Sequence, residues 1–214
     1  MLSGGLDSAT CLYWAREKFA NVSAITFDYV GRLVQEKRAA ARLAKGAGET
    51  ELIIVDLPFM KEASDFYNGL LKKQDSEARW SSYVPARNLM FYSIAAHHAE
   101  YLGARWIVGG HNLHDATFFK DATRSYIGRL NTLFKEGCLF CDGRPYQVLL
   151  PLARMNSTGI VKLAIKLNTP IGQTWSCHIE GKAHCGRCYA CKQRLEAFGS
   201  LGLKDPAFVK AGSL

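Results

Sequence analysis

The chain has 214 residues, which is enough for one ordinary domain or for one domain with a small appendage. Hydrophobic residues make up 48% of the chain and charged residues 21%, a globular composition that excludes a disordered chain. No apolar run approaches the ~18 residues of a membrane-spanning helix, and the N-terminus has no signal-peptide pattern, so we expect a cytoplasmic protein. The net charge of +8 comes from scattered residues and favours an ordinary basic surface over a nucleic-acid partner.

Helix-like and strand-like segments alternate along the chain. Segments rich in β-branched and aromatic residues predict strands, and Ala-rich segments with cap signals predict helices. In chain order, the predicted elements are a helix over 9–19, a strand over 22–29, a helix over 33–46, a strand over 51–57, helices over 59–73 and 87–102, a strand over 106–110, a helix over 122–135, a strand over 146–152 and a helix over 157–167. This alternation predicts an α/β fold with a parallel, doubly wound sheet.

The sheet also needs a strand before residue 3, where only Met1 and Leu2 are present. We expect that strand to be very short, unless the natural chain starts upstream or has been trimmed. Ligands of such sheets bind at the carboxyl ends of the strands. The predicted ends are residues 2–3, 28–29, 56–57 and 109–110.

The strongest local signal is the sequence SGGLDS at residues 3–8. Its two glycines allow a tight turn and a close approach to an anion, and the helix that follows presents unpaired N–H groups and the positive end of its dipole. Ser3 and Ser8 carry hydroxyls that can donate to phosphate oxygens, whereas Asp7 suits a bound Mg²⁺ or the ordering of the loop. No lysine follows the glycines, so the motif differs from the P-loop.

Four of the seven cysteines lie within residues 177–191, in the pattern C-x7-C-x2-C-x2-C. Four thiolates at this spacing can converge on one tetrahedral Zn²⁺ with a closed shell, which indicates a structural rather than a catalytic site. An iron–sulfur cluster is the alternative. We expect a nucleotide-binding α/β domain over 1–170 and a zinc-binding segment over 171–214. The predicted ligands are Cys177, Cys185, Cys188 and Cys191.

Two further segments have weaker signals. Cys138 and Cys141 form a C-x2-C pair, for which two partly buried loop cysteines are a simpler explanation than a redox pair or a thiol carrier. Pro85 suits a helix start, after which Arg87 can hold a phosphate and Asn88 an adenine edge or a ribose.

These motifs resemble one family in their order along nearly the whole chain. The loop at 3–8 is similar to the SGGxDS pyrophosphate loop of the ATP pyrophosphatase superfamily. The sequences FDY at 27–29, VPARN at 84–88 and GGHNLHD at 109–115, with the cysteine motif and the KQRLEAF that follows, resemble the 7-cyano-7-deazaguanine (preQ0) synthases, the ExsB-type branch. The loop is specific only to the superfamily, whereas the cysteine motif is far more specific to the branch.

The resemblance implies an ATP-dependent carbon–nitrogen ligase. Its members convert 7-carboxy-7-deazaguanine and ammonia into preQ0, in queuosine and deazapurine biosynthesis. It also implies one structural Zn²⁺ per chain, ATP with Mg²⁺ as a substrate, and a homodimer. We expect free ammonia as the nitrogen source, because the sequence contains no glutaminase domain.

The motifs and the resemblance together assign roles to individual residues. The expected catalytic residues are Ser3, Asp7 and Ser8. The expected nucleotide-binding residues are Ser3, Gly4, Gly5, Leu6, Asp7, Ser8, Phe27, Asp28, Tyr29, Arg87, Asn88, Gly109 and Gly110. The expected substrate-binding residues are Asn112, Asp115, Phe119, Lys120 and Asp121.

One segment departs from the family pattern. After Asp115 the family usually continues Phe-Ser-Gly-Tyr-Pro-Asp-Cys-Arg, whereas this chain has ATFFKDAT and keeps only the aspartate, as Asp121. The departure bears on the substrate more than on the chemistry. A carboxylate such as Asp121 matches the N1–H and amino donors of a guanine-like base, and Lys120 either neutralises the substrate carboxylate or points to solvent.

Two other functions stay open at this point. A tRNA thiolase of the same superfamily would adenylate a base carbonyl and insert sulfur, with Cys138 and Cys141 as its thiols. The net charge of +8 agrees with RNA, but the sequence has no separate RNA-binding module. A zinc-ribbon nucleic-acid binder is disfavoured by the intact loop. ATP turnover with a small carboxylate, in the absence of RNA, separates the three functions.

Overall fold

The computed structural model describes residues 1–48, 50–60, 84–138 and 145–209. None of the helices in these ranges is both long and apolar enough to cross a bilayer.

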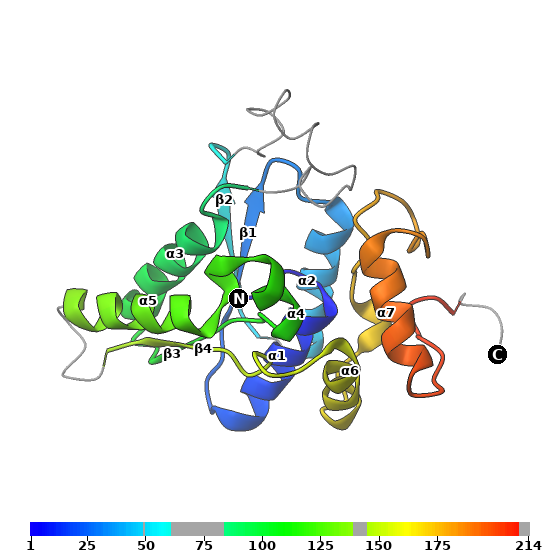
Figure 1. Cartoon of the computed structure of the whole chain (residues 1–214). Helices are drawn as coiled ribbons and strands as arrows, with labels where there is room; N and C mark the ends of the chain where they lie inside the picture. Colours follow the sequence, from blue (N-terminus) through cyan, green and yellow to red (C-terminus); the bar gives the residue numbers. More distant parts are fainter. Residues whose placement is uncertain (49, 61–83, 139–144, 210–214) are drawn as a thin grey trace.

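The order of elements confirms the predicted α/β alternation (Figure 1). The strands are β1 (Ala24–Tyr29), β2 (Leu52–Leu57), β3 (Trp106–Val108) and β4 (Gln147–Leu149). The helices are α1 (Leu6–Lys18), α2 (Val34–Gly46), α3 (Arg87–Tyr101), α4 (Leu113–Phe118), α5 (Arg124–Gly137), α6 (Ser157–Lys166) and α7 (Tyr189–Gly199), with 3₁₀ turns η3 (Lys120–Ala122) and η4 (Ile171–Gln173).

Parallel strands form the centre of the fold. β1 pairs with β2 over its whole length, and β3 pairs with β4. The first two residues lie between these two pairs: the Leu2 N–H donates to the Ile25 carbonyl at 2.8 Å, and the Met1 amino group donates to the Val108 carbonyl at 2.8 Å. Met1 and Leu2 thus take the place of the expected short strand, between β1 and β3.

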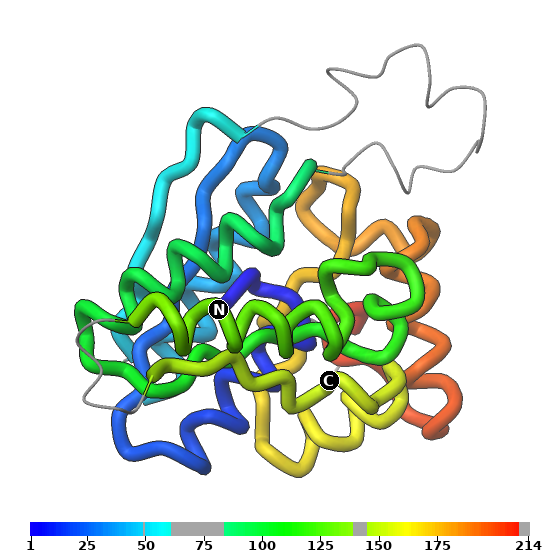
Figure 2. The backbone as a smooth tube through the Cα atoms, turned by 60° about the vertical axis from the view of Figure 1, so that its left-hand side comes forward, coloured from blue at the N-terminus to red at the C-terminus, as the bar shows by residue number. Residues whose placement is uncertain are grey.

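Helices cover both faces of this parallel arrangement (Figures 1 and 2). Neighbouring residues of a strand point to opposite faces. Ile25 and Phe27 of β1 lie in a buried cluster with α3 and α5, whereas Ala24 lies in a second cluster with α1 and α2. A third cluster joins α1 to α6 and α7, so the C-terminal part of the chain packs beside the sheet. The doubly wound arrangement expected from the sequence is therefore present.

The ends of the elements differ from the prediction by a few residues. α1 begins at Leu6, three residues before the prediction, because Gly5 takes the N-cap position and the loop passes directly into the helix. β3 and β4 are shorter than the predicted strands 106–110 and 146–152, because the chain leaves the sheet near Gly109 and before Pro151. The predicted helix over 59–73 falls almost wholly outside the described residues.

Candidate active site

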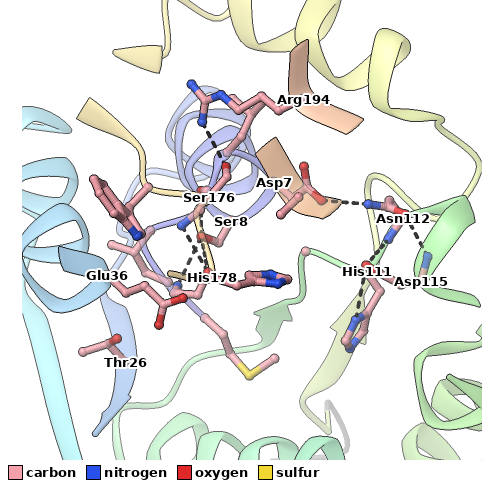
Figure 3. Close-up of a pocket in the computed structure, with 18 of the residues that line it drawn as sticks. Asp7, Ser8, Thr26, Glu36, His111, Asn112, Asp115, Ser176, His178 and Arg194 are labelled. Carbon is pink, nitrogen blue, oxygen red and sulfur yellow. Dashed lines mark hydrogen bonds and ion pairs between the residues drawn. The ribbon is translucent and has the colours of Figure 1, made fainter. Parts of the chain in front are cut away.

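A cavity of about 440 Å³ opens at the carboxyl ends of the strands, where ligands of parallel sheets bind (Figure 3). The loop 3–8, the end of β1, the start of α3 and the segment after β3 line it. The C-terminal segment closes it with side chains from residues 175–178 and from α7. The cavity is therefore built from both ends of the chain.

The loop at 3–8 is ordered by its own hydrogen bonds. The Ser8 hydroxyl accepts from the Ser3 N–H at 3.2 Å, lies 3.0 Å from the Ser3 hydroxyl and donates to the Gly5 carbonyl at 3.0 Å. Gly4 has a φ of +100°, and a Cβ there would lie 2.4 Å from the Glu36 carbonyl oxygen, so only glycine fits. No side chain caps α1, so its first N–H groups stay available to an anion in the cavity.

Asp7 lies in the first turn of α1 and is held by Asn112 (Figure 3). The Asn112 side-chain amide donates to the Asp7 carboxylate at 2.7 Å, while its oxygen caps α4 by accepting from the N–H groups of His114 and Asp115. Burial, with a smaller contribution from the negative charge of Asp115, raises the pKa of Asp7 to about 7. A carboxylate in this state, next to an anion-binding loop, takes up either a cation or a proton.

Aromatic and basic side chains form the wall between β1 and α3. The Phe27 ring stacks on the Phe91 ring at a centroid distance of 4.1 Å, which makes a flat apolar surface at the end of β1. The Arg32 guanidinium donates to the Phe27 carbonyl and, at 3.0 Å, to the Ser3 carbonyl. Arg32 thereby ties the strand end to the loop, while Arg87 brings a second positive charge to the cavity from the first residue of α3.

The C-terminal segment supplies the remaining wall, in which Ser176, His178 and Arg194 line the cavity (Figure 3). The Arg194 guanidinium donates to both oxygens of Asp205, at 2.6 and 3.0 Å, and to the hydroxyls of Thr174 and Ser176. Its donors are engaged with protein, so Arg194 supports this wall rather than binding a ligand. Burial lowers the pKa of His178, which keeps its imidazole neutral at neutral pH.

The four cysteines converge beside the same wall. Their sulfur atoms all lie within 4.8 Å of one another, with 3.9 Å between Cys185 and Cys191 and 3.9 Å between Cys177 and Cys188. Sulfurs ~2.3 Å from one tetrahedral ion lie ~3.8 Å apart, so the cluster fits a metal rather than a disulfide. The N–H groups of Arg187 and Cys188 donate to the Cys185 sulfur and lower its pKa to about 6, which favours the thiolate.

Most of the residues predicted for the site line this one cavity. They come from four separate parts of the sequence, and the fold brings them together at the ends of the strands. The predicted residues that line it are Ser3, Gly5, Leu6, Asp7, Ser8, Phe27, Tyr29, Arg87, Asn88, Gly110, Asn112 and Asp115.

Six predicted residues do not line the cavity, each for a local reason. Gly4 and Gly109 pack closely against other parts of the protein. A Cβ on Gly4 would lie 2.4 Å from the Glu36 carbonyl oxygen, and one on Gly109 would lie 2.1 Å from the Tyr92 hydroxyl. Asp28 forms an ion pair with Lys37 at 2.5 Å. In the segment that departs from the family, the Lys120 side chain is exposed and those of Phe119 and Asp121 are half-buried around η3. Cys141 lies outside the described residues.

Several lining residues were not predicted. Arg32 and Glu36 form a charged pair four residues apart, just after β1. Their position at the carboxyl end of a predicted strand is a sequence signal for residues of the site. The residues from the C-terminal segment give no comparable local signal, because only the tertiary fold brings them to the loop. These residues include Thr26, Arg32, Glu36, His111, Ser157, Trp175, Ser176, His178, Gln193 and Arg194.

Two known proteins that are similar to this chain in sequence carry the same name. A 7-cyano-7-deazaguanine synthase from Thermosynechococcus vestitus is 36% identical, covering 96% of this chain and 92% of its own length. Another from Anaeromyxobacter dehalogenans is 37% identical over the same shares. Among solved structures, the U34-tRNA thiolase NcsA from Methanococcus maripaludis, with its 4Fe-4S cluster, has a TM-score of 0.47 and 19% identity over 94% of this chain and 64% of that chain, which is too distant to support an argument.

The family comparison covers almost the entire molecule. The model of the family described as queuosine biosynthesis protein QueC matches residues 1–202, which include the loop at 3–8, the whole cavity and the four cysteines. The resemblance drawn from the motifs is confirmed, and the chain belongs to the queuosine biosynthesis protein QueC family.

Proposed function

We propose that the protein is an ATP-dependent carbon–nitrogen ligase that makes 7-cyano-7-deazaguanine from 7-carboxy-7-deazaguanine and ammonia. The observation that carries this proposal is the match to synthases of that name along 96% of the chain, at 36 and 37% identity. The cavity agrees with it, since an anion-binding loop and an aromatic wall meet at the strand ends.

The chemistry of the reaction explains why an ATP loop is needed. A carboxylate is a poor acyl donor, because oxide would have to leave. Transfer of AMP from ATP to the carboxylate releases pyrophosphate and makes AMP the leaving group. Ammonia then attacks the acyl carbon, AMP departs and an amide forms. Transfer of a second AMP to the amide oxygen, followed by loss of AMP and a proton, gives the nitrile.

The residues of the cavity divide into three proposed roles. Ser3, Ser8 and the first N–H groups of α1 bind the departing pyrophosphate, and Asp7 binds the Mg²⁺ that accompanies ATP. The remaining predicted nucleotide residues, from Phe27 to Gly110, surround the adenosine and phosphates. Asn112 and Asp115 line the cavity and bind the acid to be activated. Phe119, Lys120 and Asp121 follow them in the chain around η3 and contribute to the selection of that acid.

We propose that the cysteine cluster binds one structural Zn²⁺ per chain, in a segment over 171–214 that follows a nucleotide-binding unit over 1–170. Four sulfurs close the coordination shell, so the ion provides no open position for a reactant. Elemental analysis of the purified protein is expected to find about one zinc per chain, and Cys188→Ser is expected to lose it. Visible absorbance from iron and sulfide would instead assign the cluster to iron–sulfur chemistry.

We propose, from the resemblance, that the enzyme is a cytoplasmic homodimer. Sedimentation of the purified protein would measure its state of association, and fractionation of cells would locate it. A monomer at the concentrations used for assay would remove the dimer from the proposal.

The reaction itself is tested by analysing its product. Mass spectrometry of a mixture of 7-carboxy-7-deazaguanine, ATP, Mg²⁺ and ammonium with the enzyme is expected to show the nitrile, together with AMP and pyrophosphate. A control without ammonium is expected to make no nitrile. If the enzyme turns over ATP with a different acid and ignores this one, then the altered segment after Asp115 has changed the substrate.

A further inference from the structure

Trp175 contacts the loop at 3–8 directly. Its backbone N–H donates to the Gly4 carbonyl at 2.8 Å, and its own carbonyl lies 3.6 Å from the position of a Cβ on Gly5. Gly4 is also close to α2, because a Cβ on it would lie 2.4 Å from the Glu36 carbonyl oxygen. The C-terminal segment and α2 therefore both contact the loop, and Trp175 provides the contact from the C-terminal segment.

The indole of Trp175 points toward the cysteine cluster. Its Nε1–H donates to the Cys177 carbonyl at 2.8 Å, and its ring lies against His184 with 4.4 Å between the centroids. The residue is buried and belongs to one packed group with Ala39 of α2, Cys177 and Cys191. The same residue therefore contacts the loop through its backbone and the first cysteine through its side chain.

A metal ion in the cluster would fix where this residue lies. Cys177 follows Trp175 by two residues, whereas Cys188 is the N-cap of α7 and Cys191 lies in its first turn. An ion shared by these sulfurs joins the chain at 175–177 to α7, and metal–thiolate bonds of this kind contribute strongly to local folding. The bonds at the ion are thus connected through one residue to the backbone of the loop.

We propose that Trp175 is a positioning residue that couples metal binding at the cysteine cluster to pyrophosphate binding at the loop 3–8. The inference rests on the proposed function, in which the loop binds the pyrophosphate of ATP. Because the two binding equilibria are linked, the metal raises the affinity for pyrophosphate by the same factor as pyrophosphate raises the affinity for the metal. We expect a factor of about ten, within the range usual for coupled sites.

The coupling is measured by calorimetric titration of the full chain with inorganic pyrophosphate and Mg²⁺. The protein loaded with Zn²⁺ is expected to bind pyrophosphate about tenfold more tightly than the protein treated with a chelator. The tryptophan fluorescence is expected to change when Zn²⁺ is restored, since the Trp175 ring lies in the packed group around the cysteines.

A matched pair of variants isolates the side chain. Trp175→Phe keeps the backbone N–H that donates to Gly4 at 2.8 Å. It removes the indole Nε1–H and replaces the bicyclic ring by a smaller one. It is expected to retain about one Zn²⁺ per chain, to bind pyrophosphate several-fold more weakly, and to lose most of the zinc-dependent difference and of the fluorescence change. Trp14→Phe is the control and is expected to keep the wild-type ratio, because Trp14 lies on α1 and its ring contacts Phe19 just after that helix.

The possible outcomes separate this inference from the function on which it rests. Equal pyrophosphate affinities with and without Zn²⁺, or an unchanged ratio in Trp175→Phe, would overturn the coupling while leaving the loop as the binding site. Lack of pyrophosphate binding by the folded, zinc-loaded protein would overturn the proposed role of the loop. If circular dichroism shows that the chelated protein has unfolded, the coupling is measured through the affinity for Zn²⁺ instead. Zinc is then expected to bind about tenfold more tightly in the presence of pyrophosphate.

Discussion

Replacement of Asp7 by asparagine is expected to lower ATP turnover by roughly a hundredfold or more, while making the unliganded protein more stable above pH 7. The loss of activity follows from the proposed role of the Asp7 carboxylate in binding Mg²⁺ beside the pyrophosphate. An amide of the same shape keeps the side chain in place opposite Asn112 but carries no charge for the cation. The fold and the loop are therefore expected to remain intact.

The gain in stability follows from the direction of the pKa shift. Burial raises the pKa of Asp7 from 3.8 to about 7, so between these values the folded protein binds a proton that the unfolded chain releases. Stability then falls as the pH rises from about 4 to about 7 and stays lower above that, because the buried carboxylate is charged. Asparagine removes this loss, and each 1 kcal/mol regained raises the Tm of a chain of this size by about 2–4 °C.

Thermal unfolding of both proteins from pH 4 to pH 8, without nucleotide, measures this effect. The advantage of Asp7→Asn is expected to be absent near pH 4 and largest near pH 8. For the wild type, kcat/KM is expected to fall below about pH 7 as Asp7 takes up a proton. Asp56→Asn, an exposed residue of β2 outside the cavity, is the control. An active Asp7→Asn enzyme would remove this carboxylate from the mechanism.

The sequence predicted those parts of the site that depend on a few adjacent residues. The loop at 3–8 is recognisable because both its backbone conformation and its hydroxyls are encoded locally, and the Gly4 φ of +100° is an example. The cysteines are recognisable because their spacing alone allows convergence, which the sulfur distances confirm. The alternation of strands and helices likewise follows from local patterns of hydrophobicity.

The parts that were not predicted depend on contacts between distant segments. Arg194 is a basic residue on a helix with no distinctive local pattern, yet it is buried because Asp205, Thr174 and Ser176 accept its hydrogen bonds. Trp175 lies two residues before the first cysteine of the cluster, but only the fold places its N–H on the Gly4 carbonyl. The lengths of β3 and β4 were also not predicted. β-propensity alone predicts longer strands than those observed, so packing sets where they end.

Substitution of Arg194 by methionine is expected to destabilise the protein by about 3–5 kcal/mol, which lowers the Tm by several degrees at least. The Arg194 and Asp205 side chains are 3% and 0% exposed, so removal of the guanidinium leaves a carboxylate buried without its partner. The hydroxyls of Thr174 and Ser176 lose a donor at the same time. The wall beside the loop is expected to loosen, which raises the KM for ATP.

A double-mutant cycle separates the ion pair from simple packing. Arg194→Met combined with Asp205→Leu removes both charges, and this pair is expected to recover much of the stability lost in Arg194→Met, because no unpaired charge stays buried. Lys192→Ala, at an exposed position of the same helix, is the control and is expected to change stability by less than about 0.5 kcal/mol. Thermal and denaturant unfolding measure the wild type, the single variants Arg194→Met and Asp205→Leu, the double variant and Lys192→Ala. If Arg194→Met is as stable as the wild type, the guanidinium does not hold α7 to the segment at 171–176, and the wall of the cavity must be maintained by the cysteine cluster and by apolar packing alone.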